Sequence, residues 1–244
     1  MRMSILKVFD KVKQKKAGCT AVIVAAGSSR RMGADKLFLP MAGIPVIVRT
    51  LLQFQNCDSI DEIIIVTRED KLVEVADYCK QFEITKATKI LQGGKERVES
   101  SVAGVFEASR HSGYIAISDG ARPLVTPELI TATVEAAKKF GAAAPAVPVK
   151  DTIKVAENGV VTDTPDRSKL FAIQTPQVFE ADLIKGALTK AMRDKTPVTD
   201  DCSAVEAMGY PVHLIEGSYQ NIKITTQDDL IISQAYLAAK GNGV

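Results

Sequence analysis

Apolar residues recur along this chain in two alternating patterns from residue 20 onward. One pattern is a short, continuous apolar run, as expected of a strand that is buried on both faces. These runs occupy 20–26, 62–67, 88–91, 114–118 and 142–149. The other pattern is a longer segment with the apolar spacing of an amphipathic helix. These segments occupy 44–56, 71–80, 96–109 and 126–140.

Local signals support two of the helix assignments. Pro45 suits the first turn of a helix, and Thr126 followed by Pro127 suits a cap and the first helical position. Strands that alternate with helices of this length form βαβ units with right-handed crossovers. The sequence therefore predicts an α/β fold, a Rossmann-like three-layer sandwich with a mostly parallel sheet.

This fold predicts where a ligand binds. In such sheets, ligands lie outside the carboxyl ends of the strands, near the point where the strand order reverses. The loops at 27–36, 92–96 and 119–125 follow strands and become the candidates, together with segments that return from the C-terminal half.

Residues 150–170 interrupt the alternation. Short strand-like pieces flank Asn158-Gly159, which is a strong signal for a two-residue hairpin turn. A lone hairpin is too small to be stable by itself. We therefore expect a projecting arm that packs on a second subunit, which predicts a homodimer.

The regular pattern resumes after the arm. It predicts strands at 170–174 and 211–216 and helices at 181–192, 200–208 and 227–240. Asp200 or Asp201 is suited to cap the helix near 200, and Gly209 is suited to end it.

The composition excludes several classes of protein. Of the 244 residues, 46% are apolar and 25% are charged, as in soluble globular proteins. This length predicts one large domain, expected over 19–240. A net charge of +2 is too balanced for a surface that coats nucleic acid, so no nucleic-acid partner is expected. There is no run of about 18 apolar residues, so no membrane span is expected.

Cysteine and histidine usage favours a reducing compartment. The four cysteines form no CxxC pair and the two histidines are far apart, which disfavours a zinc site and a disulfide framework. Residues 1–18 form a basic extension that lacks the apolar core of a signal peptide. We therefore expect a cytoplasmic protein.

The first strand leads into the sequence AAGSSRRMG, which is followed by Asp35-Lys36. This loop matches neither GxGxxG nor GxxxxGK[ST], so dinucleotide binding and a Walker loop are not supported. Its small residues nevertheless let backbone N–H groups approach an anion, and its basic residues add charge. Taken alone, the loop is equally compatible with a polyphosphate site and a solvated turn.

Further polar motifs follow the other strands. The motifs, in chain order, are AAGSSRRM, GGKERVES, DGARP, DTIK, TPDR, QTPQ, VTDD and NIKIT. Together they resemble the 2-C-methyl-D-erythritol 4-phosphate cytidylyltransferase family, in order and spacing, over about residues 19–240. The resemblance implies the fold of the nucleotide-diphospho-sugar transferases and the transfer of a cytidylyl group from CTP to methylerythritol phosphate, with release of pyrophosphate.

The resemblance also implies roles for individual residues. Transition-state stabilisation and phosphate contacts fall on Arg31, Lys36 and Lys223. Nucleotide binding falls on Ala25, Ala26, Gly27, Gly94, Ser100, Asp119 and Gly120. Acceptor binding falls on Thr152, Arg167, Thr175 and Thr199, and the arm that carries Arg167 crosses into the neighbouring subunit. Mg²⁺ is expected to be held mainly through the CTP phosphates, with no residue assigned as a metal ligand.

The chemistry of this reaction fits the residues. A phosphate nucleophile is already ionised at neutral pH, so no Ser–His or Cys–His pair is needed, and cations must overcome the repulsion between anions.

Two alternative functions stay open. One is a ribitol or ribulose 5-phosphate cytidylyltransferase, which shares most of these motifs. The other is a non-catalytic nucleotide-binding paralogue that uses the arm to dimerise.

Overall fold

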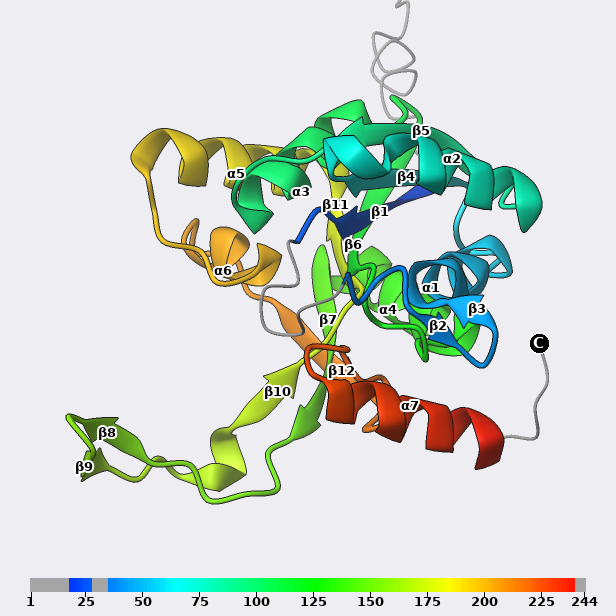
Figure 1. Cartoon of the computed structure of the whole chain (residues 1–244). Helices are drawn as coiled ribbons and strands as arrows, with labels where there is room; N and C mark the ends of the chain where they lie inside the picture. The colour runs from blue at the N-terminus through cyan, green and yellow to red at the C-terminus, as the bar shows by residue number, and fades with distance from the viewer. Residues whose placement is uncertain (1–17, 28–34, 240–244) are drawn as a thin grey trace, which may run out of the picture.

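A mixed sheet forms the centre of the computed structural model, which describes residues 18–27 and 35–239 (Figure 1). The eight-stranded sheet has the order β10-β7-β11-β6-β1-β4-β5, and β12 pairs with β7. Its strands are β1 (Gly18–Ala25), β4 (Glu62–Thr67), β5 (Ala87–Gln92), β6 (Ser112–Asp119), β7 (Ala142–Pro148), β10 (Phe171–Ile173), β11 (Gln177–Glu180) and β12 (His213–Glu216). The α-helices are α1 (Val46–Gln55), α2 (Leu72–Gln81), α3 (Arg97–Glu107), α4 (Pro127–Phe140), α5 (Ala181–Asp194), α6 (Asp201–Glu206) and α7 (Gln227–Ala239).

Most neighbouring strands of this sheet run parallel. β1 pairs in parallel with β4 and β6, β4 with β5, and β12 with β7. β11 runs antiparallel between β6 and β7, and β10 is antiparallel to β7. The predicted α/β fold with a mostly parallel sheet is confirmed, and two reversed strands are added to it.

Side chains that alternate along the central strand enter two separate cores. Ala21 and Ile23 of β1 pack into a core with residues of α1, α2, α4 and α7. Val22 packs into the other core with residues of α3, α5 and α6. Because successive side chains of a strand point to opposite faces, a strand covered on both sides needs a continuous apolar run. This arrangement gives the predicted three layers.

The predicted helix starts are largely confirmed. Thr126 caps α4, since its side chain accepts a hydrogen bond from the backbone N–H of Leu129, and Pro127 occupies the first turn. Asp200 caps α6 through a reciprocal pair of hydrogen bonds with Ser203. Both signals depend only on neighbouring residues, which is why the sequence displays them.

Two parts of the sheet region differ from the prediction. The helix expected at 44–56 begins at Val46, because β3 (Ile44–Pro45) pairs with β2 (Pro40–Met41) in a small hairpin. Arg49 stabilises this hairpin by donating to the carbonyl of Met41 at 2.6 Å. Strand β11 was not predicted at all, because its short run lies directly before α5 and only its two neighbouring strands define it as a strand.

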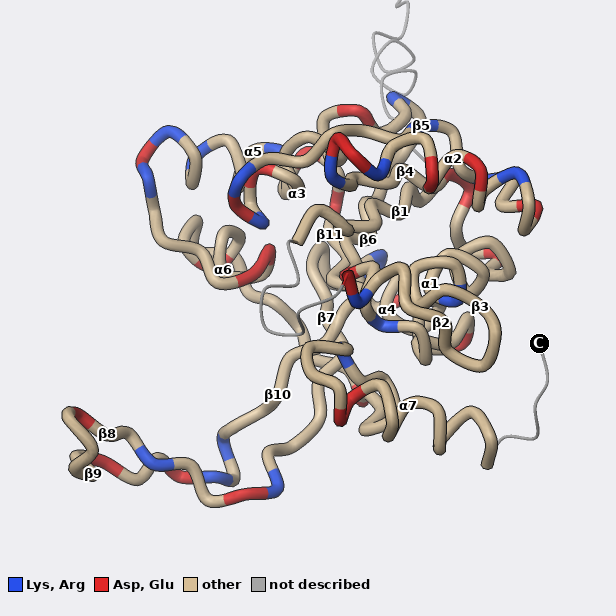
Figure 2. The backbone as a smooth tube through the Cα atoms, viewed as in Figure 1, with Lys and Arg blue, Asp and Glu red and all other residues tan. Residues whose placement is uncertain are grey.

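The predicted arm is a β-hairpin that projects from the body of the protein (Figure 1). It consists of β8 (Val155–Glu157) and β9 (Val160–Asp163), joined at Asn158 and Gly159, which have φ angles of 51° and 81°. Basic and acidic residues follow one another along the arm and its stem (Figure 2). No residue of β8 or β9 is buried within this chain, so packing on a second subunit stays a prediction.

Two other predictions concern the termini and the membrane. The basic extension at 1–18 lies, apart from Gly18 in β1, outside the described residues. Within 18–27 and 35–239, none of the helices combines the length and the apolar character needed to cross a membrane.

Two helical glycines provide a test of the packing between α3 and the sheet. A Cβ at Gly104 of α3 would lie 2.3 Å from Cγ1 of Val22 and 2.9 Å from Cγ2 of Val66, whereas one at Gly186 of α5 would meet nothing within 4 Å. We expect Gly104→Ala to lower the free energy of unfolding by about 1–3 kcal/mol through overpacking. We expect Gly186→Ala to raise it by about 0.5–1 kcal/mol through helix propensity.

Urea denaturation of both variants measures these changes. Alanine favours a helix at both positions, so the difference between the variants reports the close approach of α3 to β1 and β4. Equal gains in stability for the two variants would contradict this packing.

Candidate active site

A cavity of about 360 Å³ opens at the carboxyl ends of β1, β5 and β6. This volume is within the range of small-molecule sites. The residues that line it are Val24, Ala25, Ala26, Gly27, Lys36, Leu37, Gly94, Lys95, Glu96, Arg97, Ser100, Asp119, Ala121, Lys223 and Thr225. The cavity therefore lies where the fold predicts a ligand, at the strand ends where the chain order reverses from β5 to β6.

Close backbone packing shapes the wall formed by β1 and β5. A Cβ at Gly93 would lie only 2.4 Å from Cβ of Ala26 and 2.6 Å from Oγ of Ser100. The backbone N–H of Gly94 donates to Oγ of Ser100 at 3.2 Å. Glycine at 93 is thus needed for the wall itself, and Ser100 is fixed in place before any ligand binds.

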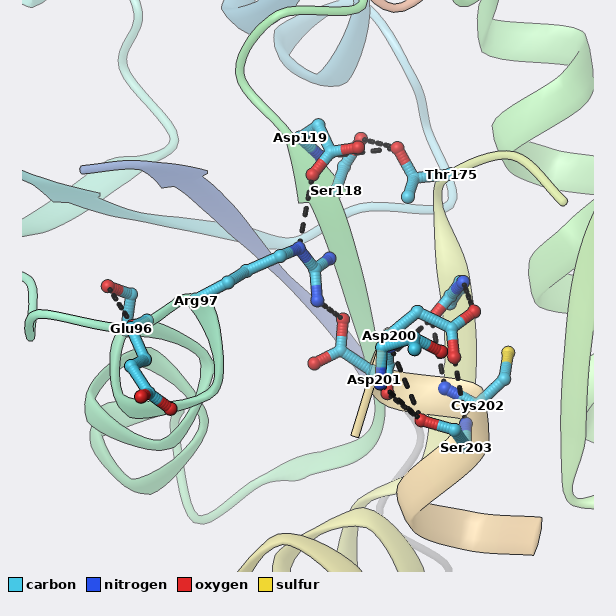
Figure 3. A network of polar contacts seen from close by, with 12 residues as sticks. Glu96, Arg97, Ser118, Asp119, Thr175, Asp200, Asp201, Cys202 and Ser203 are labelled. Atoms are coloured by element: carbon cyan, nitrogen blue, oxygen red, sulfur yellow. Dashed lines mark hydrogen bonds and ion pairs between the residues drawn. The ribbon is translucent and has the colours of Figure 1, made fainter. Parts of the chain in front are cut away.

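The first turn of α3 supplies another wall. Glu96 caps the helix in a capping box, in which Oε2 of Glu99 accepts from the backbone N–H of Glu96 at 3.0 Å. This cap starts the helix at Arg97 and holds Lys95, Glu96, Arg97 and Ser100 along the cavity. Arg97 is the first residue of this helix, and its side chain extends across to Asp119 at the end of β6 (Figure 3).

Asp119, the last residue of β6, lies at the centre of the polar contacts. Its carboxylate is 2.9 Å from Nζ of Lys223, 3.3 Å from Nε of Arg97 and 3.6 Å from Nε of Arg122. The residue is only 7% exposed. Burial alone would raise the pKa of this carboxyl, but Lys223, Arg97 and Arg122 outweigh that effect and lower the pKa to about 2. Asp119 is therefore charged at every physiological pH.

Two segments from the C-terminal half hold this centre in place. Oγ1 of Thr175 accepts from the backbone N–H of Asp119 at 3.1 Å and lies 3.0 Å from Oγ of Ser118 (Figure 3). Asn221 donates to the carbonyl of Thr175 at 3.0 Å and accepts from Nη1 of Arg122 at 2.6 Å through its own carbonyl.

The segment at 221–225 is also bonded to the loop after β6. The backbone N–H of Ile224 donates to the carbonyl of Ala121 at 2.9 Å. This bond brings Lys223, which is remote in the sequence, to the carboxylate of Asp119.

A second buried carboxylate lies behind Arg97. Asp201, the first residue of α6, is 1% exposed, and its Oδ2 is 2.7 Å from Nη1 of Arg97. Burial raises the pKa of the Asp201 carboxyl against the opposing effect of Arg97. Gln177 of β11 fixes the start of α6, because its Oε1 accepts from the backbone N–H groups of Asp201 and Cys202.

The structure brings most of the predicted nucleotide and phosphate residues to one place. The predicted residues that line the cavity are Ala25, Ala26, Gly27, Lys36, Gly94, Ser100, Asp119 and Lys223. Gly120 does not line it, although a Cβ there would lie 3.2 Å from Cβ of Ala25. Arg31 lies outside the described residues.

The predicted acceptor residues divide into two groups. Thr175 does not line the cavity itself, but its side chain accepts a hydrogen bond from the backbone N–H of Asp119, which does. Thr199 is exposed in the turn before α6, where its backbone N–H donates to Oγ of Ser203 at 3.1 Å. Thr152 and Arg167 are exposed on the arm and its stem, and Nη1 of Arg167 donates to the carbonyl of Lys150 at 2.8 Å. Within one chain, none of the last three lines the cavity.

No role in the site was predicted from the sequence for Glu96, Arg97, Arg122, Asp201 or Thr225. Arg97 and Glu96 lie inside the motif GGKERVES, and Asp201 lies inside VTDD. The sequence signal that could have identified these residues is a charged side chain within one of these polar motifs. No sequence signal indicated that Arg97 pairs with Asp201, which lies 104 positions later in the chain. This pairing depends on the tertiary structure, which brings the start of α6 to the start of α3.

The geometry defines a cavity lined by several basic residues in an α/β protein. Its basic residues face a space at the carboxyl edge of the sheet, and neither His111 nor His213 lines it. A model of the 2-C-methyl-D-erythritol 4-phosphate cytidylyltransferase family (IspD) matches residues 19–239. The chain belongs to this family.

Curated relatives agree with that assignment over nearly their whole length. A protein of Caldanaerobacter subterraneus subsp. tengcongensis, named 2-C-methyl-D-erythritol 4-phosphate cytidylyltransferase, is 46% identical over 226 residues, covering 89% of this chain and 98% of the relative. A protein of the same name from Halalkalibacterium halodurans is 44% identical over 223 residues, covering 91% and 97%.

Solved structures show the same fold. A 4-diphosphocytidyl-2C-methyl-D-erythritol synthase from Anaerococcus prevotii has a TM-score of 0.81 and 32% identity, covering 91% of this chain and 97% of that chain. A 2-C-methyl-D-erythritol 4-phosphate cytidylyltransferase from Thermus thermophilus has a TM-score of 0.75 and 30% identity, covering 89% and 98%.

The charge balance at Asp119 predicts a pH dependence of stability. Its pKa is lowered to about 2 in the folded protein from an ordinary value of 3.8. The stability that it contributes is therefore complete above about pH 4 and is lost as the pH falls through about 2. We expect Asp119→Asn to cost about 3–5 kcal/mol at pH 7, because three cations lose a buried partner.

Urea unfolding at several pH values between about 2.5 and 7 measures this effect. The difference in unfolding free energy between wild type and Asp119→Asn should narrow by about 1.5 kcal/mol toward the acid end, because the unfolded wild-type chain binds a proton at Asp119 at a higher pH than the folded protein does. A difference that stays constant over this range would show that the three cations do not stabilise a charged Asp119.

Proposed function

We propose that this protein transfers the cytidylyl group of CTP to 2-C-methyl-D-erythritol 4-phosphate, giving 4-diphosphocytidyl-2-C-methyl-D-erythritol and pyrophosphate. The observation that carries the proposal is the cationic cavity around Asp119, in a chain that belongs to a family of cytidylyltransferases. The relatives named for this activity are 41–46% identical to the chain.

The nucleophile needs no activation by a base. An oxygen of the acceptor phosphate is already ionised and attacks the α-phosphorus of CTP, and the bond to pyrophosphate breaks on the opposite side. Repulsion between the anions and the charge on the pentacoordinate phosphorus form the barrier. Lys36 and Lys223 line the cavity and supply positive charge there, and Arg31 of the adjoining loop has the same proposed role.

The nucleoside of CTP is proposed to bind between β1 and the start of α3. Gly94 and the pre-fixed Ser100 line this side of the cavity beside Ala25 and Ala26, so small residues and one hydroxyl face the base. The proposed ribose contacts come from Gly27 and Asp119, which line the cavity, and from Gly120, which follows Asp119 in the chain but does not line the cavity.

The cavity fits a Mg²⁺ ion that the substrate carries. Within the described ranges, no group of three or more His, Cys, Asp or Glu side chains is placed to hold a metal ion. Asp119 and Glu96 are the carboxylates that line the cavity. Mg²⁺ is often held by one or two carboxylates together with substrate phosphates and water. We therefore infer a Mg²⁺ held mainly by the CTP phosphates near Asp119, where it would neutralise phosphate charge.

The acceptor pocket is proposed to form between two subunits. Arg167 and Thr152 are exposed on the projecting arm and do not line the cavity of their own chain. The arm and its stem also expose Ile153, Val155, Val160 and Val161. A second copy would cover these apolar side chains and receive Arg167, whose guanidinium can grip a phosphate with two hydrogen bonds.

The proposed location of the reaction is the cytoplasm. All four cysteines are free thiols, and Cys19, Cys57 and Cys202 are buried. Free, buried thiols are typical of proteins from a reducing compartment.

The acceptor distinguishes this proposal from its nearest alternative. Pyrophosphate release with CTP and Mg²⁺ should be strong with 2-C-methyl-D-erythritol 4-phosphate and weak with ribitol 5-phosphate, each measured with and without metal. A preference for ribitol 5-phosphate would assign the same chemistry to a different acceptor. No release with either acceptor from folded protein that binds CTP would favour a non-catalytic paralogue.

Two variants test the phosphate site and the arm together. We expect Lys36→Ala to lower turnover by about 10²–10³, by analogy with the loss of one donor to a developing oxyanion. Arg167→Ala should raise the KM for the acceptor. Lys80→Ala is the matched control for a lost lysine charge, because Lys80 is 82% exposed on α2 and does not line the cavity.

Hybrid dimers show which cavity the arm serves. A dimer of one Lys36→Ala chain and one Arg167→Ala chain should recover about half of the wild-type activity, because the intact arm of the first chain completes the intact cavity of the second. Hybrids no more active than the parents would mean that the arm does not serve the partner's cavity.

A further inference from the structure

Arg97 spans two buried carboxylates that belong to different parts of the fold. It is the first residue of α3, and its side chain crosses to the end of β6 and the start of α6 (Figure 3). Its Nε is 3.3 Å from Oδ1 of Asp119, and its Nη1 is 2.7 Å from Oδ2 of Asp201. Arg97 lines the cavity, whereas Asp201 does not.

Asp201 is held in a fixed position by hydrogen bonds at the start of α6, so it can anchor the side chain of Arg97. Its backbone N–H donates to Oε1 of Gln177 at 3.0 Å, and the next residue, Cys202, donates to the same atom at 3.1 Å. Gln177 in turn donates to Oδ2 of Asp200 at 2.7 Å. Because the Asp201 residue is 1% exposed and its backbone is tied to β11, its carboxylate can influence the cavity through Arg97.

The three cations on Asp119 differ in how firmly they are held. Arg122 is 9% exposed and donates to the carbonyl of Asn221 at 2.6 Å, and Arg97 is held by Asp201. The side chain of Lys223 is 39% exposed. A phosphate-bearing substrate in the cavity therefore competes with Asp119 for Lys223 more easily than for either arginine.

We propose that Arg97, anchored by Asp201, is a positioning residue for the cytidylyl transfer. It keeps the Asp119 carboxylate oriented and its charge compensated, so that Lys223 can leave Asp119 for the substrate phosphates. This inference rests on the proposed function, since the phosphates of that reaction are what draw Lys223 away.

The electrostatic reason is the cost of an uncompensated buried charge. Without Arg97 in place, Arg122, at 3.6 Å, would be the one cation among the described residues that still pairs with Asp119 once Lys223 moved. A buried carboxylate in that state is strongly unfavourable, so Asp119 would hold Lys223 back. The penalty would fall mainly on the chemical step, because the contact between Lys223 and phosphate strengthens as charge develops in the transition state.

Asp201→Asn tests the anchor, with Asp200→Asn as its matched control. The two aspartates are adjacent and both stabilise the start of α6, but only Asp201 contacts Arg97. We expect Asp201→Asn to lower kcat about tenfold while the KM for CTP changes less than about threefold, which is the pattern of a lost transition-state interaction. Asp200→Asn should leave the Tm close to that of wild type and kcat within about twofold of it, because asparagine caps a helix about as well as aspartate does.

Arg97→Lys is a second variant that keeps the charge and the fold. Lysine lacks the planar fork that lets Arg97 contact both carboxylates at once, so kcat should again fall about tenfold. Adding Asp201→Asn to Arg97→Lys should cause little further loss, because Asp201 acts through Arg97. A purely structural role for Asp201 would instead make the two losses multiply.

The outcomes separate this inference from the function on which it rests. Wild-type kcat in folded Arg97→Lys, or independent losses in the double variant, would overturn the positioning role alone. Absence of pyrophosphate release from the wild-type protein would overturn both proposals. A lower kcat in both single variants, a preserved KM for CTP and non-additivity would support the positioning role.

Discussion

A buried carboxylate surrounded by three cations is the interaction on which this site depends. Asp119 ends β6 inside the protein, and Arg97, Arg122 and Lys223 approach it from α3, from the loop after β6 and from the segment before α7. Without Asp119, these positive groups would repel one another at short range. With it, they are held together at the carboxyl edge of the sheet. The same contacts thus stabilise the fold and concentrate positive charge beside the cavity.

The topology of the sheet brings these residues together. Parallel strands place the ends of β1, β5 and β6 at one edge, and the reversed strand β11 then brings Thr175 and Gln177 beside β6. The chain crosses back to the same edge after β12, where Ile224 bonds to the loop after β6. Residues from 25 to 225 therefore form one cavity, although each motif alone is a short loop with few contacts of its own.

Unlike the residues around Asp119, the hairpin of the arm is not buried within this chain. Its residues Thr152 and Arg167 are exposed, and the hairpin formed by β8 and β9 packs on no core within this chain (Figure 1). A hairpin of this size gains too little burial to be stable by itself. The proposed pocket between two copies would cover the isolated arm and complete the proposed acceptor site.

Local sequence patterns determined the order of most strands and helices, the Thr126 cap, a cap at Asp200 or Asp201 and the Asn158-Gly159 turn, because each depends on neighbouring residues. The predicted fold indicated the loops that form the site, since the carboxyl ends of parallel strands must meet at one edge. The family resemblance of the motifs indicated the individual residues of the cavity wall, from Ala25 to Lys223. Tertiary structure alone decided that β11 is a strand and that Arg97 lies between Asp119 and Asp201. Strand pairing and burial arise from segments far apart in the chain, and no local pattern encodes which buried charges will meet.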